Sequence, residues 1–319
     1  MGGKKALREE IYQIFPKDHK KYAEVFGGGG WVLFGKRQRP GCIEVYNDFN
    51  GDLVNLFLCV RDKCLPLLEE LGFLPLNSRD EYRLLKKFLK KESFPNGYLY
   101  ENLELADRYL PEPSAREIKE ILTIQAEQYD VRRAAAYYKS IRYSYSSGGS
   151  SYGARPLNIR DFFGLFWSCS RRLARVVIEH KDFESLIAQY KGADTLFYCD
   201  PPYYDAECYE VAFPKEDHRR LRDALKDSGS RWVVSYNDVP FIRELYKGYY
   251  IFPVTRLDNQ RQRYAAGAEY AEVIITNFEP TDYPQEPVRQ LTLFDEPEGK
   301  NQPTVTLTKE MEEANEHEN

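Results

Sequence analysis

The sequence has little of what metal sites, disulfide frameworks and membrane spans require. Its six cysteines form no Cys-x-x-Cys pair and its four histidines are scattered, so no zinc-binding pattern is present. No apolar run approaches the roughly 20 residues of a membrane-spanning helix, and the first residues contain no apolar signal core. Ala6 stands where N-myristoylation would need Ser or Thr. We therefore expect an intracellular protein with reduced thiols and no membrane attachment.

Length and composition fit a globular protein of about two domains, or one core that carries an insertion. The chain has 319 residues, 42% hydrophobic and 30% charged, which excludes a mostly disordered protein. Its net charge of -5 is uneven, because residues 281–319 carry -7 and the preceding residues +2. Residues 132–175 hold nine Lys or Arg, one Asp and nine aromatic residues. This block predicts a nucleic-acid surface, with a solvated helix face as the alternative.

Apolar patterning alternates between short strands and longer helices. Strands are expected at 22–26, 42–46, 176–179, 195–199, 232–235, 249–253 and 271–276. Helices are expected at 4–15, 53–71, 79–91, 114–139, 162–175 and 215–226. The alternation is typical of an α/β fold with a parallel sheet, interrupted by a mostly helical insertion.

Four glycines, Gly27 to Gly30, follow the first expected strand. Such a loop between a strand and a helix lets a nucleotide-like ligand approach the backbone. The dinucleotide pattern needs its third glycine where Val32 or Leu33 stands, which disfavours a dinucleotide oxidoreductase. Asp48 ends the second expected strand, where a carboxylate can accept both hydroxyls of a ribose. Together these features predict an adenosine-type ligand without a pyrophosphate.

The run Asp200-Pro201-Pro202-Tyr203 follows another apolar strand. The two prolines remove N–H donors and leave nearby carbonyl oxygens free to accept hydrogen bonds. A carboxylate, free carbonyls and an aromatic ring form a socket for a planar group that bears an amine, such as a nucleobase. Asp200 and a proline carbonyl would accept from the amine, and Tyr203 would hold the base in line with a methyl sulfonium. The alternative is a proline-rich turn after a core strand.

These motifs, in this order, resemble the Dam-type α class of DNA adenine-N(6) methyltransferases over most of residues 1–278. The matching segments are Gly2-Gly3-Lys4, the glycine loop, the segment with Asp48, Asp182-Phe183, the Asp200 tetrad, Ser235-Tyr236-Asn237-Asp238 and Glu272-Val273-Ile274-Ile275-Thr276-Asn277. Two positions depart from the family pattern. Only Met1 precedes Gly2, where an aromatic residue is usual, and Val25 replaces a proline.

The resemblance implies an α/β, Rossmann-like fold that uses S-adenosyl-L-methionine (SAM), with a mostly parallel seven-stranded sheet. It implies a catalytic domain in two parts (1–58 and 173–279), a helical DNA target-recognition insertion (59–172) and a disordered acidic tail (280–319). The expected activity is site-specific methylation of a flipped-out adenine in double-stranded DNA. A cytosine-N(4) methyltransferase and a catalytically inactive DNA-binding protein remain alternatives. Asp200 favours adenine, because cytosine enzymes more often carry Ser there.

The resemblance also implies roles for individual residues. The catalytic residues would be Asp200, Pro201, Pro202 and Tyr203. The cofactor would be bound by Lys4, Phe26, Gly27, Gly28, Gly29, Asp48, Asp182, Phe183 and Asp200. For DNA, charge and position predict contacts from Arg132, Arg133, Lys139, Arg142, Tyr145, Ser147, Tyr152 and Arg155, with a solvated loop as the alternative.

A short apolar motif interrupts the polar tail. Gln290, Leu291, Leu293 and Phe294 lie in a pentapeptide that resembles the one by which bacterial replication proteins bind the sliding clamp. Packing of these residues on the body of the protein is the alternative. The remaining expectations are a monomer or weak dimer that binds double-stranded DNA, in the cytoplasm and associated with the nucleoid.

Overall fold

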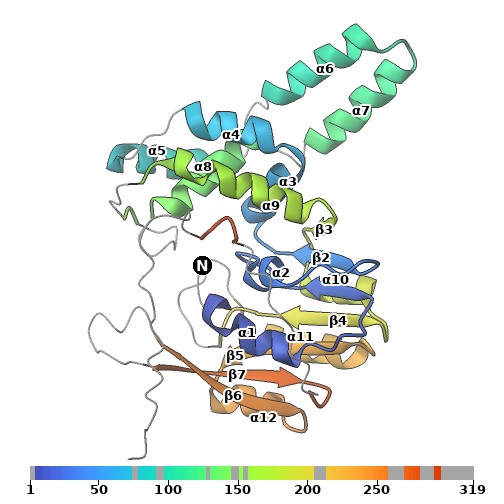
Figure 1. The fold of residues 1–319 in the computed structure, drawn as a ribbon, viewed down its shortest axis with the longest axis vertical. Helices are drawn as coiled ribbons and strands as arrows, with labels where there is room; N and C mark the ends of the chain where they lie inside the picture. The colour runs from blue at the N-terminus through green and yellow to red at the C-terminus, as the bar shows by residue number, and fades with distance from the viewer. Residues whose placement is uncertain are drawn as a thin grey trace, which may run out of the picture.

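A computed structural model of the chain describes residues 4–73, 78–90, 97–126, 130–144, 151–153, 157–204, 213–257, 269–280 and 291–295. Its centre is a seven-stranded sheet in the order β3-β2-β1-β4-β5-β7-β6 (Figure 1). The strands are β1 (Lys21–Glu24), β2 (Ile43–Asn47), β3 (Val176–Glu179), β4 (Thr195–Cys199), β5 (Arg231–Asn237), β6 (Tyr250–Leu257) and β7 (Glu269–Thr276). Among these strands β7 runs antiparallel to both of its neighbours, β5 and β6, and the other neighbouring pairs are parallel. The predicted mostly parallel sheet and Rossmann-like methyltransferase fold are confirmed.

Both faces of the sheet are covered, which is why its central strands are apolar along their whole length. All five residues of β4 are buried. Leu196 and Tyr198 enter one apolar core, while Phe197 and Cys199 enter the core on the opposite face. The first core holds α1 (Lys4–Ile14), α2 (Trp31–Gly35), α3 (Gly51–Asp62) and α9 (Phe163–Leu173), and the second holds α10 (Phe183–Tyr190), α11 (Lys215–Asp227) and α12 (Pro240–Leu245).

The residues between β2 and β3 are mostly helical, as predicted. The helices α4 (Cys64–Phe73), α5 (Arg79–Leu89) and α8 (Val131–Arg142) pack with α3 and α9. The single helix expected over 53–71 is two helices, because the backbone leaves the helical conformation at Lys63, between α3 and α4. The single helix expected over 114–139 is also two, α7 (Ser114–Ala126) and α8, and α6 (Gly97–Tyr109) was not predicted.

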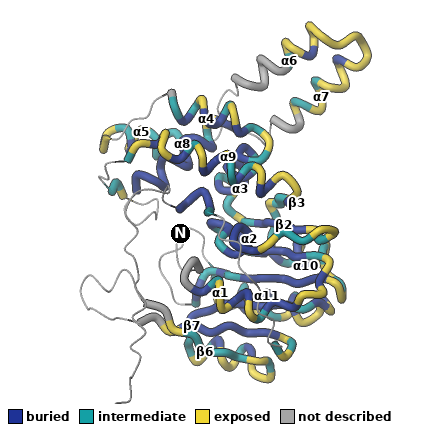
Figure 2. The backbone as a smooth tube through the Cα atoms, viewed as in Figure 1, coloured by how far each residue is buried: buried dark blue, intermediate teal, exposed yellow. Residues whose placement is uncertain are grey.

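The helices α6 and α7 form a hairpin that projects from the rest of the molecule (Figure 1). Most of its described side chains are exposed (Figure 2). Residues 97–126 carry six acidic and three basic side chains. Their net negative charge repels phosphate, so this part of the predicted DNA-recognition insertion has the wrong sign for contacts with the DNA backbone.

A buried ion cluster fixes α9 to the sheet. Arg172 donates to both oxygens of Glu44 on β2, at 2.7 and 3.2 Å, and Lys36 donates to the same carboxylate at 2.8 Å. The two cations hold the pKa of Glu44 below its ordinary value against the opposing effect of burial.

Among the described residues, no helix has the length and apolarity that a membrane crossing requires.

Candidate functional site

The glycine loop and the Asp200 tetrad leave the sheet side by side. The strands β1 and β4 are parallel neighbours, with Glu24 paired with Tyr198, and the Val25 amide donates to the Tyr198 carbonyl at 2.9 Å. The chain continues into Phe26 and Gly27 on one strand and into Asp200 on the other. Because both strands end at the same edge of the sheet, the two predicted motifs form one site there.

Asp200 is held by a hydroxyl from the next strand. Ser235 of β5, fully buried, donates to Oδ1 of Asp200 at 3.1 Å. The Ser235 Oγ also lies 3.2 Å from the Tyr198 hydroxyl of β4. This hydrogen bond orients the Asp200 carboxylate through one of its oxygens.

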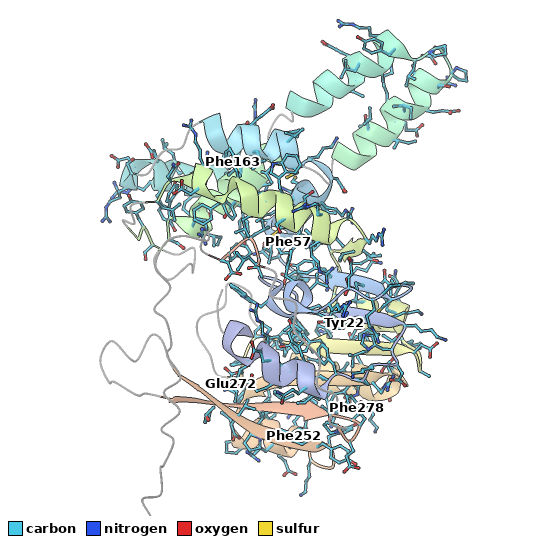
Figure 3. The ribbon with its side chains drawn as sticks, in the orientation of Figure 1. Tyr22, Phe57, Phe163, Phe252, Glu272 and Phe278 are labelled. Carbon is cyan, nitrogen blue, oxygen red and sulfur yellow. The ribbon has the colours of Figure 1, made fainter. Side chains whose placement is uncertain are left out.

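Tyr203 is fixed at the far end of its ring. Its hydroxyl donates to Oε2 of Glu272 on β7 at 2.6 Å, and both side chains are buried. Figure 3 labels Glu272, which lies toward the end of the sheet to which the β4 arrow points in Figure 1. The next residue is tethered as well, because the Asn237 amide of β5 donates to the Tyr204 carbonyl at 2.9 Å. Three contacts from β5 and β7 therefore set the conformation of the tetrad.

The glycine loop needs glycine because side chains of β2 and α2 press on it. A Cβ on Gly27 would lie 2.1 Å from Cε2 of Tyr46, and Gly30 has a φ of +69°. The Tyr46 hydroxyl donates to the Gly28 carbonyl at 2.8 Å. Tyr46 in turn stacks on Phe57 of α3, with ring centroids 4.4 Å apart. Phe57 is labelled in Figure 3. The loop is therefore shaped from one side by the packing of α3 on the sheet.

Asp48 is built into the same loop. One carboxylate oxygen accepts from the Gly28 amide and the other from the Asn50 amide, both at 2.8 Å. Burial raises the pKa of Asp48, and these two amides oppose the rise. Each oxygen keeps a lone pair, so the fixed carboxylate can still accept from the two hydroxyls of a ribose.

A cluster of aromatic rings lies beside the loop. Phe26 and Phe183 have ring centroids 5.7 Å apart, and Phe213 lies 5.7 Å from both. Asp182 begins α10 by accepting from the Glu184 amide at 3.0 Å, and it lies 3.5 Å from Arg220. Apolar rings next to a ribose-binding acid fit an adenine ring. The glycine loop, Asp48 and this cluster therefore fit an adenosine-containing cofactor such as SAM.

Glu24 places a further acid beside Asp200. It ends β1, is 2% exposed, and accepts from the Tyr22 hydroxyl at 3.3 Å. Burial raises the pKa of Glu24 to about 8, and the charge of Asp200 adds to the rise. At neutral pH Glu24 is therefore mostly protonated.

Four of the predicted DNA contacts on α8 differ in their exposure. Arg132 is exposed and 3.9 Å from Glu70. Arg133 pairs with Asp52 and donates to the Leu89 carbonyl at 3.0 Å. Lys139 and Arg142 are 7% and 3% exposed, and burial lowers the pKa of Lys139. The helix turns the side chains of Lys139 and Arg142 into the protein, which disfavours their predicted contacts with DNA.

The loop after α8 is described only at its base. Ser144 and Tyr152 pair as an antiparallel bridge, and the Tyr152 ring lies 5.8 Å from Tyr82 and 5.6 Å from the guanidinium of Arg79 on α5. A basic α5 is thus next to the predicted recognition loop. Among the predicted site residues, Gly2, Gly3, Tyr145, Ser147, Arg155 and Gln290, and the side chain of Lys4, lie outside the described residues.

The apolar motif of the tail packs on the body. Leu293 is fully buried and Phe294 is 9% exposed, and both belong to the core between α8, α9 and the sheet. The expectation of a disordered tail is wrong for residues 291–295. Of the two interpretations of this motif, the structure favours packing on the body over a free clamp-binding peptide.

Three residues of the site were not among the predicted ones: Ser235, Glu272 and Glu24. Two of them left a signal, because Glu24 and Glu272 are acids within otherwise apolar strands, where an unpaired charge would be costly. Ser235 begins one of the segments that resemble the family, but its residue type indicated no role, since a small polar residue in a strand is common. Its importance follows from the strand order β4-β5, which brings it to Asp200.

Comparisons with known proteins agree with this geometry. The model of the family described as D12 class N6 adenine-specific DNA methyltransferase matches residues 1–262, which include the glycine loop and the tetrad. The chain is 24% identical over 305 residues to the type II methyltransferase M1.LlaDCHI of Lactococcus lactis subsp. cremoris, covering 87% of this chain and 93% of the relative. It is 27% identical over 268 residues to the type II methyltransferase M.MjaIII of Methanocaldococcus jannaschii, covering 78% and 87%.

A solved structure, the rRNA methyltransferase aviRa from Streptomyces viridochromogenes, is similar with a TM-score of 0.33 and 10% identity, covering 87% of this chain and 86% of the other. The family match alone spans most of the chain and confirms the resemblance drawn from the motifs. The chain belongs to the D12 class N6 adenine-specific DNA methyltransferase family and is an adenine-specific DNA methyltransferase.

Proposed function

We propose that this enzyme transfers the methyl group of SAM to the N6 amine of an adenine that has swung out of double-stranded DNA at a specific sequence. The observation that carries the proposal is the joint site at the ends of β1 and β4. There Asp200, oriented by Ser235, lies next to a glycine loop and an acid that fit an adenosine-containing cofactor. Bound SAM supplies an electrophilic methyl group on a sulfonium.

The chain's own residues would make the amine reactive. The N6 lone pair of adenine is delocalised into the ring, which makes the amine a poor nucleophile. Hydrogen bonds from its two N–H groups to Asp200 and to a carbonyl of Pro201 or Pro202 favour a pyramidal nitrogen with a directed lone pair. Methylation of the amine would release one proton from the nitrogen, and the Asp200 carboxylate and water would accept it.

Tyr203 would supply the stacking surface for the base. Its hydroxyl bond to Glu272 fixes the plane of the ring before substrate arrives. A stacked base contributes about 1–3 kcal/mol, comparable to the cost of removing it from the duplex. A preset ring therefore offsets part of the cost of base flipping.

We propose that α5 carries much of the DNA-backbone contact. The exposed side chains of α5 and of the residue that caps it include Arg79, Arg83, Lys87 and Lys90. The helix adjoins the base of the predicted recognition loop through Tyr152. In Figure 1, α5 lies toward the side to which the β4 arrow points. Arg132 is the exposed cation of α8 and extends this surface. Phosphate contacts of this kind fix register on the duplex without reading sequence.

The relatives are named type II methyltransferases, which supports a short specific target sequence and a role in restriction-modification for this chain as well. The test is expression in a host free of DNA methylation, followed by sequencing that distinguishes modified bases. We expect N6-methyladenine at one short sequence. Unmodified DNA would support the inactive alternative, and N4-methylcytosine would support the cytosine alternative.

A further inference from the structure

Residues 291–295 are buried between the helices α8 and α9 of the insertion side and the catalytic sheet. In Figure 1 they form the short red stretch near α9 and α2. Thr292 and Leu293 are fully buried, and Phe294 and Asp295 are 9% and 2% exposed. Burial of this degree in a segment that follows the last strand needs specific partners.

The segment forms its own turn. The Thr292 amide donates to the Asp295 carboxylate at 2.8 Å, and the Asp295 amide donates to the Thr292 carbonyl at 3.1 Å. The Phe294 amide donates to the Thr292 hydroxyl at 3.2 Å. These bonds satisfy the polar groups of the turn internally, so the segment can enter an apolar socket at low cost.

Two polar side chains of α8 hold its backbone. The Tyr138 hydroxyl donates to the Leu293 carbonyl at 2.9 Å, and the Arg142 guanidinium donates to the Phe294 carbonyl at 3.0 Å. On the α9 side, the Cys169 thiol lies 3.6 Å from the Leu291 carbonyl. Arg142, which charge patterning assigned to DNA, thus binds the backbone of the 291–295 segment.

The other side of the segment lies against the glycine loop. A Cβ on Gly29 would lie 3.3 Å from Cδ2 of Phe294 and 2.8 Å from the indole nitrogen of Trp31. The Phe294 ring is 6.2 Å from that of Tyr138. Tyr46 presses on the loop at Gly27, and Phe294 and Trp31 press on it at Gly29. The loop is therefore held between β2 and the C-terminal segment.

We propose that residues 291–295 act as a clasp that holds the glycine loop in its cofactor-binding shape, with Phe294 as the positioning residue. This inference rests on the proposed use of SAM. The clasp also joins the loop to α8, so the insertion and the cofactor site share one packing unit. Loss of the clasp should weaken SAM binding more than it slows turnover at saturating SAM.

The experiment compares chains that end at residue 295 and at residue 290 with the full chain. SAM dissociation constants come from calorimetry, and KM for SAM and kcat come from methylation of host DNA. We expect the chain of 295 residues to match the full chain and the chain of 290 residues to bind SAM at least about tenfold more weakly. A synthetic peptide of residues 289–296 should restore binding, and the same peptide with Leu293 and Phe294 replaced by Ala should not.

If the truncated chain does not fold, the full chain with Phe294→Ala provides a second test. We expect a raised SAM KM with a smaller change in kcat, and no change for Leu110→Ala, an exposed apolar residue away from the socket. Lower thermal stability with unchanged SAM affinity in Phe294→Ala would overturn the proposal and leave a purely structural role. If the full chain itself bound no SAM, the proposed function would fail instead.

Discussion

Ser235 connects β5 to the acid at the end of β4, and its role can be separated from folding. Ser235→Ala removes the donor at 3.1 Å from Asp200 and leaves the strand otherwise intact. A hydrogen bond to a charged group is worth about 1.5–3 kcal/mol, so we expect kcat to fall about 10- to 100-fold. SAM affinity should change little, because the hydrogen bonds of Ser235 go to Tyr198, Cys199 and Asp200 and not to the glycine loop or Asp48.

The control for Ser235 is Ser228→Ala, which removes a buried hydroxyl that donates to the Leu225 carbonyl at 2.7 Å, in the turn after α11. Both variants should lose similar thermal stability, but only Ser235→Ala should lose turnover. Methylation rates measured at saturating SAM and DNA provide the comparison. Equal rates in the two variants would mean that Ser235 does not position Asp200.

The residues themselves show what the sequence could and could not predict about the site. Asp200, Asp48 and the glycines sit at the ends of strands, where a linear pattern reveals both the strand and its last residue. Lys139 and Arg142 carry the same charge as a DNA contact, but their direction depends on what packs against α8. Arg142 donates to the Phe294 carbonyl, about 150 residues away in the chain, and Lys139 donates to the Glu70 carbonyl on α4. No local pattern indicates either contact.

At the scale of elements, we expect α5 to contact the DNA backbone and the net negative α6–α7 hairpin not to contact it. Replacement of Lys87 and Lys90 by Ala on α5 should raise the DNA KM at every DNA sequence tested. It should also make the dependence of binding on salt less steep, by about one in the log–log slope for each lysine. Neither residue is near the cofactor loop, so SAM affinity should be unchanged.

The matched change on the hairpin is Arg116→Ala with Lys119→Ala, which also removes two positive charges. Lys119 pairs with Asp107 at 2.6 Å within the hairpin, whose net charge is negative. Fluorescence anisotropy of labelled duplex at several salt concentrations measures both pairs. A larger effect of the hairpin pair would contradict the assignment of the DNA surface to α5.

Elements were predicted best where burial is complete on both faces. All seven strands were expected near their observed positions, because short apolar runs between polar turns leave few alternatives. Helix ends were predicted less well: periodicity continues across the break at Lys63, so α3 and α4 looked like one helix. The hairpin helix α6 was missed because it packs mainly on α7 and lacks a wide apolar face.

For the whole molecule, Glu24 predicts an unusual dependence of stability on pH. The folded state raises the pKa of Glu24 from 4.5 to about 8, so it keeps a proton that the unfolded chain has released. Stability must therefore fall as pH rises through this range, by up to about 1.4 kcal/mol per pH unit. Buried His19 and His218, with pKa values lowered to about 3 and 4, act in the opposite direction only below about pH 6.5.

The window from about pH 6.5 to 8 therefore isolates Glu24 from these histidines. Glu24→Gln keeps the size of the side chain and cannot ionise. We expect the wild-type protein to lose stability across this window and the variant to lose much less, in urea unfolding followed by circular dichroism. Parallel curves for the two proteins would show that Glu24 is ionised in the folded state.

The central claim is that the Asp200 carboxylate binds the target amine beside the cofactor, and Asp200→Asn tests it most directly. The change keeps shape and the contact with Ser235 but replaces an acceptor oxygen with a donor. With purified protein, labelled SAM and DNA from an unmethylated host, we expect SAM and DNA binding to persist while methyl transfer falls at least about 10³-fold. Methyl transfer at the wild-type rate by Asp200→Asn would contradict the account.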